Sequence, residues 1–333
     1  MLNLNIGLLN VENLFLLFDQ ELPPNYEKLT EPQWQKLSTS TYENKPLNKT
    51  LQLAQTIKDL NPDIMQLVEV GGAESLKNFN HYFLNDQYSP ILIEGNSDRN
   101  IDVGFLIKKN SDFYFDLITH KNRLINFLYP HEIQSNKTNY PPQIVSHKFS
   151  RDCAELRLFR QNVNKPFLIL LLTHLKSPLD PERIDPNGFE RRKAEMNSCI
   201  EIYTELKEQF PQCPIMLCGD FNGQASKDNT DAEFVNLYAK TQLQDVLEVC
   251  KIPQENRSTF IQIKSGFRSE GRQIDYCFIP PELEPHLDKN SVSVIDYKDE
   301  YRTPLKKPDT LEQKASLPSD HYPLFFRLEK LKF

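Results

Sequence analysis

Short runs of apolar residues, each bounded by polar or turn-forming residues, recur along the whole chain. Residues 4–11, LNIGLLNV, and 167–175, FLILLLTHL, are nearly continuous apolar runs of strand length. This pattern is typical of strands that are buried on both faces. Further strands are predicted at 63–70, 88–94, 101–109, 112–118, 143–149, 153–159, 214–222, 258–263, 272–279, 291–297 and 323–329.

Two segments follow a helical period instead. Residues 47–60 place apolar side chains at steps of three and four, and Asn61-Pro62 ends the pattern. Residues 189–210 form a second, longer candidate helix. Many apolar strands with few long helices predict an α/β fold of two packed mixed sheets with helices outside, as one domain over residues 1–333.

The connecting segments are polar. Residues 18–46 contain four prolines and are expected to leave the core, whereas 121–142 appear irregular. Residues 299–316 are expected to form an exposed loop. None of these segments shows a repeat or a glycine-serine linker.

Composition narrows the class of protein. The 333 residues carry a net charge of −7, which argues against a globally basic surface for duplex nucleic acid and fits a cleft that gathers divalent cations. The six cysteines are scattered without a CxxC pair, as expected of buried thiols in a reducing compartment. The apolar N-terminus lacks the basic region and cleavage site of a signal peptide, and no apolar run approaches the roughly 20 residues of a membrane span. A cytoplasmic protein is therefore predicted.

Polar side chains stand at the ends of the predicted strands. Buried strands hold carboxylates in their middle only at a large desolvation cost, whereas their ends can present them to a cleft. The residues concerned are Asn10, Glu69, His174, Asp220, Asn222, Asp275, Asp320 and His321.

Taken singly, each of these residues has a structural interpretation. Asp220 in Gly-Asp-Phe-Asn could form an Asx turn, Asp320 could cap a turn, and His174 could be a hydrogen-bonded core histidine. Taken together, the acids, amides and histidines suit phosphoryl transfer with a hard divalent cation. Carboxylate oxygens bind Mg²⁺, and a histidine bonds the phosphate or supplies a proton.

Short motifs follow one another between residues 7 and 324: GLLNVENLF, DIMQLVEV, SDRNIDVGFL, FSRDCAEL, THLKS, CGDFNG, RQIDYCFI and PSDHYPL. In this order they resemble the endonuclease/exonuclease/phosphatase superfamily, the deoxyribonuclease I-like proteins, and in particular its bacterial members. That resemblance implies a four-layer α/β sandwich and a metal-dependent phosphoric ester hydrolase. GDFN and SDH in order are the specific part of the signal.

The resemblance also implies a metal site. Glu69 matches the main ligand, Asn10 the metal-site amide and Asp320 a further metal-site carboxylate. The implied cofactor is Mg²⁺, with Mn²⁺ as an alternative.

Catalytic roles are implied for five residues. Asp220 matches the residue that activates the attacking water, and Asn222 lies beside it on the phosphate. His321 matches the histidine on the scissile phosphate, with Asp275 as its orienting partner. His174 resembles a second histidine near the phosphate.

Basic residues are expected to face the substrate. Arg151 matches a recurring substrate-facing arginine, and Lys176 could add positive charge near the phosphate. Arg191 and Arg192 could do the same or could form a solvated helix face. Asp102 matches a supporting acid in an Arg-Gly-Ile-Asp pattern, but Asn100 stands here in place of the glycine, which leaves the shape of this loop open.

The substrate remains open between two classes. Phe221, Gly223 and the sequence Gln273 to Tyr276 differ from the inositol phosphatase pattern. The N-terminal motif NVENLF and the motif THLKS resemble bacterial members of the nuclease type. The predicted function is a Mg²⁺-dependent phosphodiesterase that hydrolyses nucleic acid. The alternative is a phosphatase or phosphodiesterase of a small molecule or lipid head group, which the negative net charge favours. A non-catalytic member would show damage in the catalytic set, and none is visible.

Overall fold

The computed structural model describes residues 1–141, 143–160, 162, 164–264 and 268–331. These residues form two six-stranded mixed sheets. The first sheet has the order β15-β16-β1-β2-β4-β3. Its strands are β1 Leu2–Leu14, β2 Ile64–Val70, β3 Tyr88–Leu92, β4 Asp102–Lys108, β15 Ser293–Val294 and β16 Leu324–Leu331.

The second sheet has the order β11-β14-β8-β7-β6-β5. Its strands are β5 Tyr114–Ile118, β6 Cys153–Phe159, β7 Leu168–His174, β8 Ile215–Asp220, β11 Gln244–Asp245 and β14 Asp275–Ile279. Each sheet has one parallel pair, β1 with β2 and β7 with β8, among antiparallel neighbours. Two short hairpins lie outside the sheets: β9 Ala225–Ser226 with β10 Asn229–Thr230, and β12 Phe260–Lys264 with β13 Arg268–Arg272.

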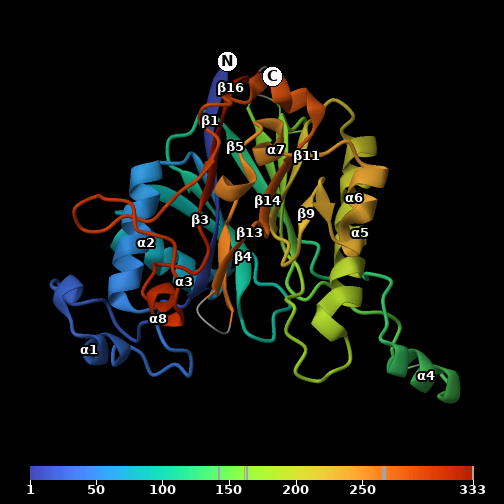
Figure 1. Cartoon of the computed structure of the whole chain (residues 1–333), viewed down its shortest axis with the longest axis horizontal. Coiled ribbons are helices and arrows are strands. Elements are labelled where there is room, and N and C mark those ends of the chain that lie inside the picture. The colour runs from blue at the N-terminus through green and yellow to red at the C-terminus, as the bar shows by residue number, and fades with distance from the viewer. Residues whose placement is uncertain (142, 161, 163, 265–267, 332–333) are drawn as a thin grey trace.

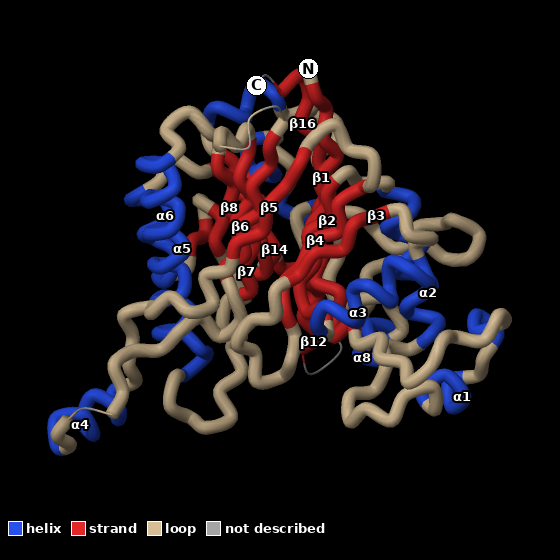
Figure 2. The backbone as a smooth tube through the Cα atoms, turned by 180° about the vertical axis from the view of Figure 1, so that it is seen from behind, coloured by secondary structure: helices blue, strands red, loops and turns tan. Residues whose placement is uncertain are grey.

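Helices cover the outer faces of both sheets. Figures 1 and 2 show α2 and α3 beside the first sheet and α5 and α6 beside the second, while α4 stands away from both. The helices are α1 Glu31–Gln35, α2 Leu47–Leu60, α3 Gly72–Asn78, α4 Pro130–Thr138, α5 Phe189–Gln209, α6 Val235–Lys240, α7 Val246–Val249 and α8 Leu311–Ala315. The predicted four-layer α/β sandwich is thus confirmed.

The apolar side chains separate into layers that match this arrangement. Leu8 and Phe326 of the first sheet pack with Leu170 and Cys218 of the second in the central core. Outer clusters join the first sheet to α2 and the second sheet to α5. The nearly continuous apolar runs of β1 and β7 follow from this, because their alternate side chains enter two different cores.

Three local expectations change. Residues 143–149 form no strand; Lys148 makes an isolated bridge with Leu124, and the Val145 side chain is 78% exposed. The segment 121–142, expected to be irregular, contains α4. Residues 258–263 do supply a strand, β12, but it pairs with β13 outside the two large sheets.

The 18–46 segment is anchored rather than free. Trp34 is fully buried, and its Nε1 donates a hydrogen bond of 3.0 Å to the Lys45 carbonyl. Its ring meets Phe18 edge-on, with the centroids 5.1 Å apart. Within the described residues, no helix has the length and apolar character needed to cross a membrane.

Candidate active site

The predicted polar residues meet at one end of both sheets, the lower end in Figure 1. The parallel register of β7 and β8 sets His174 beside Asp220, and the antiparallel register of β14 sets Asp275 opposite Asp220. Asn10 of β1 reaches the same place from the first sheet. The site therefore spans the junction of the two sheets.

The Asp220 carboxylate is the centre of this arrangement. Its Oδ2 accepts a hydrogen bond of 3.0 Å from Asn10 Nδ2 and lies 3.7 Å from His174 Nε2 and 3.9 Å from His321 Nε2. Its Oδ1 accepts the backbone N–H of Asn222 at 2.9 Å, so the Asx turn considered from the sequence is present as well. Burial, and then the charge of Asp275, raise the pKa of Asp220 to about 7.

Gly219 explains how β8 can bring Asp220 so close to β7. Its φ is +145°, and a Cβ at this position would stand 1.9 Å from the carbonyl oxygen of Thr173. The two backbones therefore touch where a side chain would separate them. This close approach explains the glycine of the GDFN motif.

His321 and Asp275 form a buried ion pair. His321 Nδ1 lies 2.8 Å from Asp275 Oδ2, and neither side chain is more than 7% exposed. Ser319 fixes the loop by donating from Oγ to the Asn10 carbonyl at 2.7 Å and accepting from the His321 N–H at 3.2 Å. Although burial lowers the pKa of His321, Asp275 and then Asp320 raise it to about 10. The imidazole is therefore charged at neutral pH, with Nε2 directed toward Asp220.

His174 is held in the opposite state. Burial, and then the charges of Arg151 and His321, keep its pKa well below the ordinary value, so the ring is neutral. Its Nδ1 has no hydrogen-bond partner among the described residues. It is therefore not the satisfied core histidine of the structural interpretation.

Glu69 lies next to His174 at the end of β2. Its backbone has a φ of +66°, and its Oε2 accepts the N–H of Asn13 at 3.1 Å. Its Oε1 lies 3.9 Å from His174 Nε2. A chain of contacts below 4 Å thus leads from Glu69 through His174, Asp220 and His321 to Asp320 Oδ1.

Two different groups of side chains could be considered for a metal ion. Asp220, Asp275 and His321 offer ligand atoms within 4.8 Å of one another. However, His321 Nδ1 and Asp275 Oδ2 are already bonded to each other at 2.8 Å, so two of these three ligands are engaged. His321 and Asp275 form a hydrogen-bonded pair, and Asp220 Oδ2 lies 3.9 Å from His321 Nε2.

Glu69 and Asp320 fit a hard cation better. Their side chains are 14% and 26% exposed. Glu69 Oε1 and Asp320 Oδ1 make no hydrogen bond with the described residues. Lys314 lies 3.3 Å from the other oxygen of Asp320 and, together with His321, outweighs burial and lowers its pKa, so this carboxylate stays ionised. Two partly exposed oxygens are the kind of donor that Mg²⁺ prefers.

Of the two predicted substrate-binding basic residues, Arg151 lies near the acidic side chains of the site, whereas Lys176 is bonded to its own loop. Arg151 is buried near Glu69 and Asp220, and its Nε has no hydrogen-bond partner in the described part of the chain. Lys176 directs Nζ to the carbonyls of Ser177 and Leu179 in its own loop.

The remaining predicted residues make hydrogen bonds and ion pairs with their neighbours. Arg192 pairs with Glu233 at 2.6 Å while only 4% exposed, so it forms neither a solvated face nor a phosphate contact. Arg191 lies 3.5 Å from Glu195. Asp102 accepts the Gly95 N–H at 2.7 Å, and Asn222 donates its side-chain amide to the Leu175 carbonyl at 3.1 Å.

Three neighbouring residues were not singled out from the sequence: Asn13, Ser319 and Lys314. Asn13 and Ser319 lie within the quoted motifs NVENLF and PSDH, so their position was a usable signal. Lys314 comes from the polar 299–316 segment, and no local pattern connects it to Asp320.

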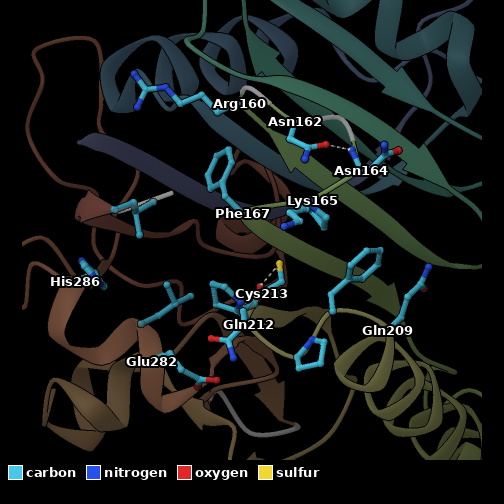
Figure 3. Close-up of a pocket in the computed structure, with 16 residues that line it drawn as sticks. Arg160, Asn162, Asn164, Lys165, Phe167, Gln209, Gln212, Cys213, Glu282 and His286 are labelled. Carbon is cyan, nitrogen blue, oxygen red and sulfur yellow. Dashed lines mark hydrogen bonds between the residues drawn. The ribbon is translucent and has the colours of Figure 1, made fainter.

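A separate cavity of about 800 Å³ lies at the other ends of the strands. Figure 3 shows Phe167 and Cys213 on its walls, near the starts of β7 and β8, and Leu331 at the end of β16 also lines it. It includes none of the predicted site residues. The polar strand ends, and not this cavity, carry the candidate chemistry.

No protein-family model and no curated protein matches the sequence. Solved structures do resemble it. Truncated TDP2 of Caenorhabditis elegans is 16% identical with a TM-score of 0.56, over 98% of both chains. The human Nocturnin catalytic domain with a bound sulfate anion is 15% identical with a TM-score of 0.56, over 98% of this chain and 93% of that one.

A third structure carries the family description. It is an endonuclease/exonuclease/phosphatase family protein from Bacteroides thetaiotaomicron, 14% identical with a TM-score of 0.53, over 98% of this chain and 97% of that one. Similarity at this level of identity concerns the fold. The chain thus has the deoxyribonuclease I-like fold of the endonuclease/exonuclease/phosphatase superfamily.

Proposed function

We propose that this protein is a Mg²⁺-dependent phosphodiesterase that hydrolyses nucleic-acid phosphodiester bonds, with Mn²⁺ as an alternative metal. The observation that carries the proposal is the Asp220 carboxylate. It is buried, held by Asn10, and placed between a neutral and a charged imidazole. A carboxylate with a raised pKa beside a cationic histidine is suited to accept a proton from water next to a bound phosphate.

The roles of the side chains follow from their charge states. The charged His321 Nε2 binds a phosphate oxygen, and Asp275 keeps the ring oriented and protonated. Asp220 takes a proton from the attacking water, which adds to phosphorus in line with the P–O bond that breaks. The leaving oxygen departs on the opposite side and takes up a proton from solvent or from His321.

Glu69, Asn10 and Asp320 are the residues that would hold the metal. When bound there, Mg²⁺ supplies positive charge to the phosphate and the leaving oxygen. Arg151, buried beside Glu69 and Asp220, adds a second positive charge at the same end of the site.

Two observations bear on the substrate. Among the structural neighbours, TDP2 of D. rerio has been solved in complex with a single-strand DNA product, at 14% identity and a TM-score of 0.57 over 98% of this chain and 99% of that one. This supports a nucleic acid. The net charge of −7 favours the second candidate, a small phosphate ester or lipid head group.

Hydrolysis by the purified protein tests the proposal. Supercoiled plasmid, bis-p-nitrophenyl phosphate and a panel of phosphomonoesters are incubated with Mg²⁺ or with EDTA. Asp220→Ala is compared with Asp116→Ala, an exposed aspartate on β5. We expect Mg²⁺-dependent nicking that Asp220→Ala abolishes and Asp116→Ala retains. Activity on small esters alone would favour the second candidate, and no hydrolysis at all would contradict a phosphoesterase.

A further inference from the structure

Tyr42, from the 18–46 segment, packs beside the proposed metal site. Its ring stacks on Phe15, with the centroids 4.6 Å apart and the planes at 10°. Phe15 in turn lies directly against Gly71, where a Cβ would stand 2.3 Å from its Cδ1. Tyr42, Phe15 and the Gly71 backbone therefore form a layered stack, and Gly71 is two residues beyond Glu69 in the chain. We call it the Tyr42 stack.

The loop around Asn100 holds this stack in place. Asn100 Nδ2 donates a hydrogen bond to the Tyr42 hydroxyl. The Asn100 backbone has a φ of +52°, the left-handed conformation that a glycine would also adopt. The replacement of the glycine of the Arg-Gly-Ile-Asp pattern therefore keeps the turn and adds a side chain that fixes Tyr42.

Arg99, next to Asn100 in the chain, is linked to Glu69 through Asn13 and brings a positive charge to this loop. Its Nη2 donates to Asn13 Oδ1 at 2.6 Å, and the N–H of Asn13 donates to Glu69. Arg99 is nevertheless exposed to solvent. Its charge also contributes to the lowered pKa of His174, in agreement with a position close to the site.

We propose that Tyr42 and Arg99 form a subsite for the nucleotide next to the scissile phosphate of a single-stranded polynucleotide. This proposal rests on the proposed nuclease function. Tyr42 is partly exposed, and Phe15 is its one stacking partner among the described rings, so it can receive an unpaired base. Arg99 binds the neighbouring phosphate. The stacking contact requires an unpaired base, because the base faces of a duplex are covered by their neighbours.

Binding without hydrolysis tests the subsite. Fluorescence anisotropy in EDTA compares a labelled eight-nucleotide thymidine strand with the same strand made of abasic units. We expect the parent protein to bind the strand with bases about tenfold more tightly, the usual effect of stacking one base. Tyr42→Ala should reduce this ratio to near one. Tyr42→Phe should keep most of it, since the ring remains.

A matched control and a second variant separate the two contacts. Tyr114→Ala removes a tyrosine that is 69% exposed at the start of β5, and it should keep the tenfold preference. Arg99→Gln should weaken binding of both strands by the same factor and lower the salt slope by about one. Circular dichroism verifies that each variant is folded.

Several results would overturn the subsite. These are equal affinity of the parent protein for both strands, no binding of either strand, or a preference that survives in Tyr42→Ala. Hydrolysis of bis-p-nitrophenyl phosphate with Mg²⁺ is measured in parallel on the parent protein. Because that ester carries no base, its failure together with failure on plasmid would contradict the phosphodiesterase function and leave the binding result readable.

Discussion

Replacing Asp275 by asparagine should discharge His321 at neutral pH. In the native protein the pKa of His321 is about 10 instead of its ordinary 6.5. This difference corresponds to a preference for the charged ring of roughly 5 kcal/mol. Burial opposes the charge, and Asp275, 2.8 Å away, is the largest contribution in its favour. Asparagine can still accept the Nδ1–H bond, so the ring keeps its place while the pKa falls toward or below 6.5.

The assay is an NMR titration of the histidine Cε1–H signals in the metal-free protein. His321→Gln assigns the signal among the seven histidines. Asp245→Asn, a second buried aspartate in the same sheet, is the matched control and should leave the titration unchanged. Turnover of Asp275→Asn at pH 8 should fall by about 10²-fold or more. A His321 pKa that stays above 9 in Asp275→Asn would refute the assignment of its charge to this carboxylate.

The same pair predicts a pH dependence of stability. The folded-state pKa of His321 lies above its unfolded value. Its contribution to the free energy of unfolding is therefore fully present below about pH 6.5. It is lost as the pH rises toward about 10. Urea unfolding should therefore show the native protein losing stability over this window, and Asp275→Asn should show much less of that loss.

Three further predictions concern other parts of the structure. Burial raises the pKa of Asp245 to about 7 from 3.8, which makes the folded state less stable by roughly 4 kcal/mol above that pH. Asp245→Asn should therefore stabilise the protein at pH 8 in urea unfolding, with a gain that shrinks toward pH 4; a gain independent of pH would contradict this. Gly219→Ala should lower the free energy of unfolding by about 3 kcal/mol or more, because a Cβ would meet the Thr173 carbonyl at 1.9 Å; a native melting temperature would disprove it. EDTA should remove activity and Mg²⁺ restore it, and Glu69→Gln should require at least about tenfold more Mg²⁺ for half-maximal rate, whereas an unchanged Mg²⁺ dependence would exclude Glu69 as a ligand.

The strands and the two long helices could be predicted because their signal is local. The apolar runs of β1, β7 and β8 are long enough to specify buried strands, and α2 and α5 follow a helical period. The segment 143–149 has the same local composition but no neighbouring strand, since Ile144 and Val145 remain exposed. Strand formation there would depend on a partner that the fold does not supply.

The site could be predicted as a set of residues but not as a geometry. The strand-end positions of Asp220 and Asp275 are visible in the sequence. Asn10, expected at a strand end, lies within β1, where the pairing with β2 shifts register after this residue. Their contacts depend on strand register and on how the sheets face each other, as in the Asp220–Asp275 pairing. The partners of the basic side chains could not be predicted either. Arg192 pairs with Glu233 and Lys176 donates to loop carbonyls, and no sequence spacing indicates these contacts.

The hydrogen bond from Asn10 to Asp220 is one of several polar contacts between two sheets whose central core is apolar. Each sheet contributes part of the polar set, so the angle between the sheets sets the distances among the reacting groups. The packing of the central core therefore influences the distances among the polar side chains of the site. In a directed-evolution experiment, libraries at core positions such as Leu8, Leu170 and Phe326 should yield variants with altered turnover and unchanged polar residues.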